Sequence, residues 1–460
     1  NASQVTVTTS GGGAVQTQGA TSFGILAQSV GGGGGAIFGP TSLLSTNLGT
    51  GIGYAGNIAV DAGANVVTSG AGSVAILGQS IGGGGGVIAS TTSNAGFVNY
   101  GTGLNSAGNG NLNAGTVAVT TRNQTIATAG ANAAAVVGQA VGASGVFFTQ
   151  ANSASQGAVN VTGYLGTVSA GGNGGADVAD AIKVTLGAGG LTTIDTSGAN
   201  AFGAIAQSVG GGGGIVAIAT QATGGTVKGA ILGQRGGSGT GLATTLTGTA
   251  NIVTRGTNAL GVVAQSISTG GGIFVVSGQS GAAFTGNVRL GATGGSGSNT
   301  RAVNVNLSGG SIATGGAYAH GLVAQSIAGG GGISGVLTND VTLGGVLAGN
   351  GGAVSVASSS AITTYGTAAA GIVAQSIGGG GGLAIGTGAV TFANAPSGSN
   401  ASQVTVTTSG GGAVQTQGTT SFGILAQSIG GGGGAIFGPT APLSTNLGTG
   451  IGYAGNIAVD

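Results

Sequence analysis

Few residues of this chain could carry acid–base, nucleophilic or metal chemistry. Its 460 residues include six aspartates, no glutamate, no cysteine and one histidine, His320. A catalytic triad needs a base and an orienting carboxylate beside the nucleophile, and a zinc site needs several nitrogen or sulfur ligands. We expect His320 on a turn between Ala319 and Gly321, with no second histidine as partner. The sequence therefore predicts that the chain is not an enzyme and holds no cofactor.

The charged residues do not indicate a metal, phosphate or nucleic-acid site either. Asp177 and Asp180 follow a glycine-rich stretch that faintly resembles a calcium-binding repeat, but calcium needs more carboxylates, so we interpret them as part of a solvated loop. No glycine run is followed by the Lys-Ser or Lys-Thr of a phosphate-binding loop. The net charge of +1, with basic residues scattered singly, provides no attraction for nucleic acid.

One apolar motif with a single polar residue recurs along the whole chain. Its first copy, GILAQSV at residues 24–30, runs directly into a stretch of five glycines. Large aliphatic residues stand two positions from the glutamine on each side, and small residues stand directly beside it. The glutamine recurs at Gln28, Gln79, Gln139, Gln207, Gln265, Gln325, Gln375 and Gln427.

This motif predicts a buried β-strand. Side chains alternate between the faces of a strand, so one face carries large–Gln–large and the other only small groups. Apolar character on both faces indicates burial on both. A buried amide without partners costs about 1–3 kcal/mol, so we expect the eight glutamines to hydrogen-bond in register as a structural ladder. An exposed glutamine row that binds sugar fits the aliphatic neighbours less well.

The glycine runs after the motif keep their length and composition in five copies. An ordered glycine costs about 0.5–1 kcal/mol relative to alanine, and a flexible linker would drift in length. We therefore expect ordered segments where backbones approach closely, either over the small face of the glutamine strand or against a neighbouring chain. The runs are Gly31 to Gly35, Gly82 to Gly86, Gly210 to Gly214, Gly378 to Gly382 and Gly430 to Gly434.

Two shared patterns precede each motif. One is Ile/Val-x-Thr-x-Gly, as in residues 126–130, and the other is an alternating strand, as in residues 303–305. Three short strands with glycine-containing turns predict one coil of a three-sided parallel β-helix. The variable segments Ser90 to Ala114 and Asn152 to Asp177 are interpreted as surface insertions. Either the downstream residues complete a second coil for each motif, or each motif belongs to one wide rung with directly stacked glutamines.

A longer period defines the organisation of the chain. Residues 1–61 reappear as residues 400–460 with four changes. Residues 1–399 thus form one full long period with seven motifs, and residues 400–460 begin the next. We expect one continuous all-β solenoid cut from a longer tandem array, and such arrays are usually structural.

The motif GIxAQSIGGGGG with its upstream Ile-x-Thr-x-Gly resembles the repeat of very large autotransporter-like surface proteins of Gram-negative bacteria. More loosely, it is similar to filamentous-haemagglutinin-type passengers. The resemblance covers essentially the whole chain and implies a right-handed parallel β-helix that is exported to the bacterial cell surface. Contact with the outer membrane would use only segments outside these residues. The shared motif is architectural, so it implies no functional residues.

Two functions of different classes follow as hypotheses. The first is a structural extracellular filament, continued lengthwise by further repeats and bundled laterally with identical chains. The second is an adhesin passenger whose variable insertions bind surfaces, host or glycans. Imaging separates them, because a filament predicts uniform, laterally associated fibres, and an adhesin predicts isolated rods with a distal tip.

Overall fold

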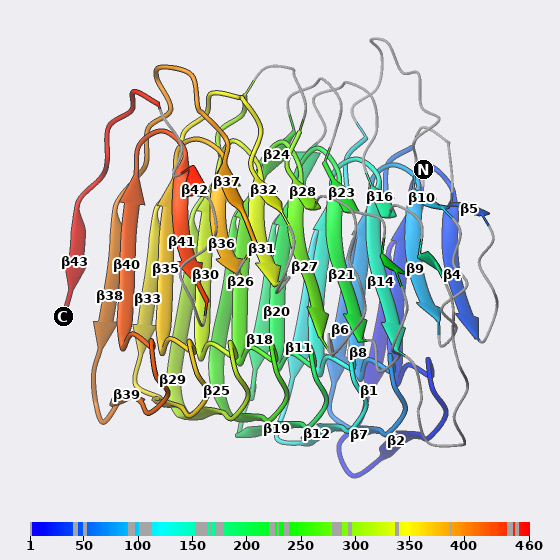
Figure 1. The fold of residues 1–460 in the computed structure, drawn as a ribbon. Coiled ribbons are helices and arrows are strands. Elements are labelled where there is room, and N and C mark those ends of the chain that lie inside the picture. Colours follow the sequence, from blue (N-terminus) through cyan, green and yellow to red (C-terminus); the bar gives the residue numbers. More distant parts are fainter. Residues whose placement is uncertain are drawn as a thin grey trace.

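The computed structural model describes most of the chain and shows an all-β parallel solenoid in these residues (Figure 1). All strand pairs in the described residues are parallel, and the rungs follow one another from the blue N-terminal end to the red C-terminal end. The described residues are 2–39, 45–48, 53–90, 97–100, 112–151, 164–165, 168–170, 178–219, 226–227, 230–233, 239–277, 288–292, 297–335, 340–386, 388–438, 445–446 and 450–460.

One rung of the solenoid contains five successive strand positions. The first rung consists of β1 (Val5–Thr9), β2 (Ala14–Thr17), β3 (Ile25–Val30), β4 (Gly34–Gly39) and β5 (Ser45–Leu48). Strands at the same position in successive rungs pair and build four large sheets. We call them sheet A, which holds the β1 and β2 positions, and sheets B, C and D, which hold the β3, β4 and β5 positions.

Sheet A has fifteen strands, because in two rungs the first and second positions merge into one long strand. Its remaining members are β6 (Ile58–Ala62), β7 (Asn65–Thr68), β11 (Val117–Thr121), β12 (Thr125–Thr128), β18 (Ile182–Leu186), β19 (Thr192–Thr196), β25 (Thr244–Thr254), β29 (Val303–Thr314), β33 (Val354–Ser358), β34 (Ala361–Thr364), β38 (Val404–Thr408), β39 (Val414–Thr416) and β43 (Ile457–Val459).

Sheets B and C form the inner layers and have eight strands each. The further strands of sheet B are β8 (Ile76–Ile81), β13 (Val136–Val141), β20 (Ala204–Val209), β26 (Val262–Ile267), β30 (Leu322–Ile327), β35 (Ile372–Ile377) and β40 (Ile424–Ile429). Those of sheet C are β9 (Gly85–Ser90), β14 (Gly145–Ala151), β21 (Gly213–Ala219), β27 (Gly271–Ser277), β31 (Gly331–Gly335), β36 (Gly381–Ile385) and β41 (Gly433–Phe437).

Sheet D is the fourth layer and also has eight strands. Its further members are β10 (Phe97–Tyr100), β16 (Val168–Ala170), β23 (Ala230–Leu232), β28 (Val288–Leu290), β32 (Val341–Leu343), β37 (Val390–Phe392) and β42 (Thr445–Asn446). Two small pairs lie outside the four sheets: β15 (Tyr164–Leu165) with β22 (Thr226–Val227), and β17 (Val178–Ala179) with β24 (Thr240–Gly241).

The structure decides between the two arrangements that the sequence left open. Each glutamine pairs directly with the glutamine of the next rung, beginning with Gln28 and Gln79, so each motif belongs to one wide rung. The two-coil alternative is wrong, and so is the three-sided coil. The first three strands of a rung lie in two stacked sheets, and the strands of sheets C and D complete the rung. The variable segments contribute β10, β15 and β16, and most of their other residues lie outside the described ranges.

The core of the described residues consists mainly of three layers of side chains between the four sheets, with a small separate cluster of Val141, Val209 and Ile267 at the ends of sheet B strands. One cluster lies between sheet A and one face of sheet B, a second between sheets B and C, and a third between sheets C and D. Inner strands of sheet B are therefore buried on both faces, as predicted. One detail of the prediction is wrong. Ile76, three positions before Gln79, shares the small-residue face and packs against sheet A.

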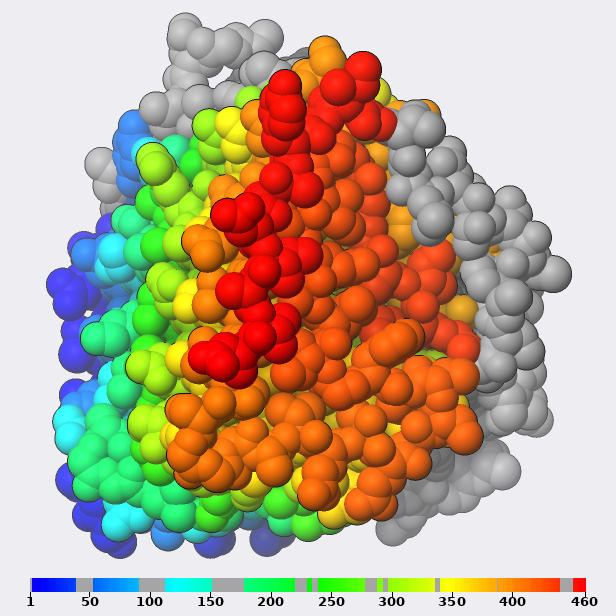
Figure 2. All heavy atoms as spheres, turned by 90° about the vertical axis from the view of Figure 1, so that its left-hand side faces the viewer, coloured from blue at the N-terminus to red at the C-terminus, as the bar shows by residue number. Residues whose placement is uncertain are grey.

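Sheets B and C continue without a break across residue 399, where the long period restarts. Figure 2 looks onto the C-terminal end of the solenoid, where residues 450–460 lie across the preceding rung. The backbone amide of Val404 donates to the carbonyl of Asn456, and that of Ala401 to the carbonyl of Tyr453. The repeated segment thus begins a new rung in the same register.

Candidate functional site

The eight predicted glutamines form one continuous ladder of side-chain amides. Nε2 of each glutamine donates to Oε1 of the glutamine in the following rung. The seven distances, in chain order from the Gln28–Gln79 pair to the Gln375–Gln427 pair, are 2.7, 2.6, 2.9, 2.9, 2.7, 2.7 and 2.6 Å. The six inner glutamines have no exposed surface, whereas Gln28 and Gln427 are partly buried. Each inner amide thus replaces its lost water partners with the amides above and below it.

The ladder lies between sheets B and C. The second N–H of three glutamines reaches a carbonyl seven residues later in sheet C, at 3.4 Å: Gln28 to Gly35, Gln139 to Val146, and Gln375 to Gly382. The glutamines therefore join successive rungs and also contact the neighbouring layer. In the described residues they are not available to a sugar, so the competing interpretation of the motif is wrong.

A second amide ladder was missed in the sequence. Asn132, Asn200 and Asn258 each lie seven residues before a ladder glutamine, at the turn between sheets A and B, and all three are buried. Nδ2 of Asn200 donates to Oδ1 of Asn132 at 2.9 Å, and Nδ2 of Asn258 donates to Oδ1 of Asn200 at 3.3 Å. The constant offset from the glutamine was the signal that could have revealed this ladder.

Backbone conformation explains why asparagine occurs at this turn. Asn132, Asn200 and Asn258 have φ between 53° and 59°, in the left-handed region that asparagine tolerates better than most residues. The equivalent residue in the second rung is Gly72, with φ of 68°. The two ladders run in opposite directions. Glutamines donate toward the C-terminal rung, and asparagines donate toward the N-terminal rung.

The threonine of the Ile-x-Thr-x-Gly pattern fixes the same turn. Thr128 Oγ1 donates to the carbonyl of Ala133, and Thr196 Oγ1 to that of Ala201, at 2.5 and 2.6 Å. The glycine of the pattern permits close stacking. A Cβ on Gly130 would lie closer than 3.0 Å to the carbonyl oxygen of Gly70 in the preceding rung. The same threonine bond recurs from Thr17 to Thr364, so the pattern specifies a similar turn in the first seven rungs.

The glycine runs are ordered and buried in the inner rungs. Gly82 to Gly86 turn from sheet B into sheet C, and the last two of them already belong to β9. The close approach of backbones is as predicted. Gly86 has φ of 143°, and a Cβ there would lie closer than 3.0 Å to the carbonyl oxygen of Gly35. Both the backbone conformation and the close carbonyl therefore exclude a side chain at Gly86.

The predicted position of the glycine runs was wrong in one respect. They fold onto the large–Gln–large face of sheet B, because strands of sheet C pack there, and not onto the small face. The segment that leads into the next rung covers them. A Cβ on Gly82 would meet the carbonyl of Leu112. In the inner rungs a neighbouring chain therefore cannot reach the glycines.

The serine after the glutamine holds this covering segment. Ser80 Oγ donates to the carbonyl of Gly56 at 3.0 Å and accepts from the amide of Gly115 at 2.8 Å. Ser376 makes the same two contacts, with Gly352 and Ser402, both at 2.9 Å. Small size alone therefore does not explain this serine, because it links the entry segments of two successive rungs.

The residues considered for chemistry are not brought together. His320 lies just after a turn at residues 317–318 and not, as was expected, on the turn itself. It is completely buried, and its Nδ1 accepts from the amide of Ala370 at 2.9 Å. Asp180 accepts from the adjacent amide of Ala181, and Asp177 lies outside the described residues. Among the described residues, no three His, Cys, Asp or Glu side chains are grouped as a metal site would require. No helix in that part of the chain is long and apolar enough to span a membrane.

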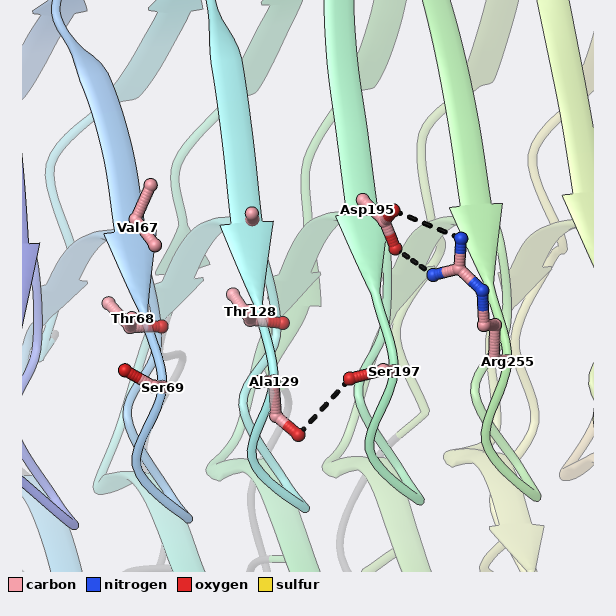
Figure 3. A pocket seen from close by; sticks show the side chains of 9 residues that line it. Val67, Thr68, Ser69, Thr128, Ala129, Asp195, Ser197 and Arg255 are labelled. Atoms are coloured by element: carbon pink, nitrogen blue, oxygen red, sulfur yellow. Dashed lines mark hydrogen bonds and ion pairs between the residues drawn. The ribbon is translucent and has the colours of Figure 1, made fainter. Parts of the chain in front are cut away.

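One shallow depression of about 440 Å³ lies on the outer face of sheet A (Figure 3). Ala127 and Ala129 are among the residues that line it, and the ion pair of Asp195 with Arg255 stands on one side. Both charged side chains are more than two-fifths exposed, at 42% and 52%. Its charged side chains bond to each other, and the hydroxyls of Ser69 and Ser197 donate to backbone carbonyls.

Comparison of the chain with protein-family models, with curated proteins and with solved structures found no match. The arrangement of the residues is therefore the basis for a functional assignment. Its main feature is a set of polar groups that bond from rung to rung inside the solenoid.

Proposed function

We propose that this chain is a structural filament outside the cell, a stiff rod whose buried amide ladder holds its rungs in one register. The supporting observation is the unbroken glutamine ladder through eight rungs. A protein built around a ligand site concentrates polar groups in a cleft, whereas this chain directs them along the axis of the rod.

The restart of the sequence at residue 400 supports lengthwise continuation of the rod. Gln375 stacks on Gln427 as earlier glutamines stack on one another, so a new long period joins without a change of register. This continuity supports the proposal that further copies of the same sequence extend the rod along its axis. Lateral association with identical chains is part of the proposal, and the outer face of sheet A, with small polar side chains and few charges, is available for it.

The test is cryo-electron microscopy of the native protein. Rungs in a parallel sheet are spaced at about 4.8 Å, so the seven rungs of one 399-residue period should span about 34 Å. We expect uniform fibres with an axial repeat near this value. Globular particles, or fibres without an axial repeat, would contradict the filament.

The alternative function is an adhesin that binds surfaces, host or glycans through its variable segments. The observation that favours it is that the largest length differences between rungs fall, in the sequence, between a strand of sheet C and the next strand of sheet A, where the variable segments stand. Deleting residues 152–163 separates the two functions. Lost binding to cells or glycans with unchanged fibres would support the adhesin, whereas unchanged binding would not.

A further inference from the structure

His320 occupies a position that is apolar in every other rung. It lies five residues before its ladder glutamine and has no exposed surface. The equivalent inner residues belong to the core between sheets B and C. The residues at this position in the other rungs are Phe23, Val74, Ala134, Phe202, Leu260, Ala370 and Phe422. The only imidazole of the chain is thus placed where the fold otherwise uses hydrocarbon.

The contacts of the ring require its neutral form. Nδ1 accepts a hydrogen bond from the backbone amide of Ala370 in the next rung, at 2.9 Å. A neutral imidazole that accepts at Nδ1 carries its proton on Nε2, and Nε2 is buried without a partner. The ring also makes an edge contact with Phe437, at 4.7 Å between centroids. The Nδ1 atom therefore links the rung of His320 to the next rung, whereas Nε2 has no hydrogen-bond partner.

No charged group near the ring can stabilise an imidazolium. Between residues 301 and 460 the charged side chains are Arg301, Asp340 and Asp460, and all three are exposed. Tyr318, at the turn before His320, is largely buried, and burial raises the pKa of its phenol, so it stays neutral.

The ring contacts Phe437 of β41 and the amide of Ala370, which leads into β35. Neither these strands nor β26, β27, β31 and β36 of the adjoining rungs carry a charged residue. Arg255 in the preceding rung is exposed and paired with Asp195.

We propose that His320 is an acid-sensitive joint, at which the rungs of β30 and β35 separate when the imidazole takes up a proton. Protonation converts Nδ1 from an acceptor into a donor that faces the N–H of Ala370. The contact then becomes repulsive, and a charge is left in an apolar layer. The charged ring must reach water, which requires this part of the core to open. This inference does not depend on the filament function.

The pH range follows from linkage. Burial lowers the pKa of His320 from 6.5 to about 3. The open form binds the proton near pH 6.5 and the closed form only near pH 3, so stability is complete above pH 6.5 and falls as the pH decreases. In that window the opening equilibrium constant rises up to about tenfold for each pH unit. A stacked array opens locally because each rung contacts only its neighbours.

The test is hydrogen exchange by mass spectrometry of the 460-residue chain at pH 7.5, 5.5 and 4.5, corrected for the intrinsic rate at each pH. We expect protection in residues 318–328 and 366–378 to fall about tenfold between pH 5.5 and 4.5, while residues 204–219 keep theirs. In His320→Leu this dependence should disappear. Leucine fits the position, since Leu260 occupies it in the preceding rung. An unchanged pH profile in His320→Leu would overturn the proposal.

A second variant tests the position of the joint. In the double variant L260H/H320L the imidazole moves one rung toward the N-terminus, so the acid-sensitive region should move to residues 258–268 and 318–328. A uniform loss of protection over all rungs of the wild-type chain would show that no local joint exists. A double variant whose acid-sensitive region stays at residues 366–378 would likewise overturn the assignment to His320.

Discussion

Gln207 accepts a hydrogen bond from Gln139 in the preceding rung, at 2.9 Å, and donates one of the same length to Gln265. This two-sided bonding makes each inner glutamine a link between three rungs. Its contribution can be measured because the ladder also has end members with one glutamine partner.

Gln207→Leu should lower the free energy of unfolding by about 2–4 kcal/mol, since it leaves one buried donor and one buried acceptor unpaired. The matched control is Gln427→Leu, which removes one ladder bond at a partly exposed position. It should cost about 1 kcal/mol. Urea unfolding followed by circular dichroism provides the measurement. Equal losses in the two variants would contradict the two-sided bonding of the inner glutamine, and no loss in either would show that the ladder bonds do not contribute.

Gly272→Ala should destabilise the chain by about 3 kcal/mol or more. Gly272 has φ of 135°, and a Cβ there would lie closer than 3.0 Å to the carbonyl oxygen of Gly214. Gly189 is the control, because its φ is 78° and a Cβ would meet no atom within 4 Å. Gly189→Ala should cost only about 1 kcal/mol. Similar thermal melting of both variants would contradict close backbone packing at the glycine runs.

Asn200→Gly tests the asparagine ladder separately from its turn. Glycine keeps the left-handed backbone, as Gly72 does in the second rung, but it removes the amide between Asn132 and Asn258. The expected loss is about 1–3 kcal/mol. At the exposed end of the same column, Thr420→Gly should leave stability unchanged or raise it, since threonine there has φ of 55°. If Asn200→Gly is also neutral, the asparagines serve the turn only.

Arg255→Gln removes an ion pair on the outer face of sheet A. The guanidinium and the carboxylate of Asp195 are largely solvated, so the loss should be below about 1 kcal/mol and should shrink further in high salt. The measurement is unfolding at low and high ionic strength. A loss above about 2 kcal/mol would mean that this pair, and not the interior amides, joins the rungs.

Sequence reasoning predicted the part of the fold that depends on repeated single residues. Gln79, for example, is polar between aliphatic neighbours in a motif that never loses it, and this was sufficient to predict its burial and its partners. The same reasoning could not count the layers of a rung. The strands of sheet D lie in segments whose sequence varies from rung to rung. Neither periodicity nor composition indicates that these segments form the fifth strand of each rung.

The asparagine ladder and the role of the serines escaped prediction for another reason. Asn132 occurs in a turn where asparagine is common for backbone reasons alone, so its type did not indicate a buried hydrogen bond. Ser80 was interpreted as merely small, because its partners, Gly56 and Gly115, are backbone groups far away in the sequence. Such contacts become visible only when the rungs are stacked.

The common orientation of the glutamine amides gives the rod a net dipole moment along its axis. Seven of the eight glutamines donate toward the C-terminal rung, and the two asparagines that donate the other way, Asn200 and Asn258, are too few to cancel them. Amide dipoles aligned head to tail add along their axis. Rods in solution should therefore orient in an applied field through a permanent dipole along the axis, and electric birefringence should show the transient dip that such a dipole gives when the field is reversed.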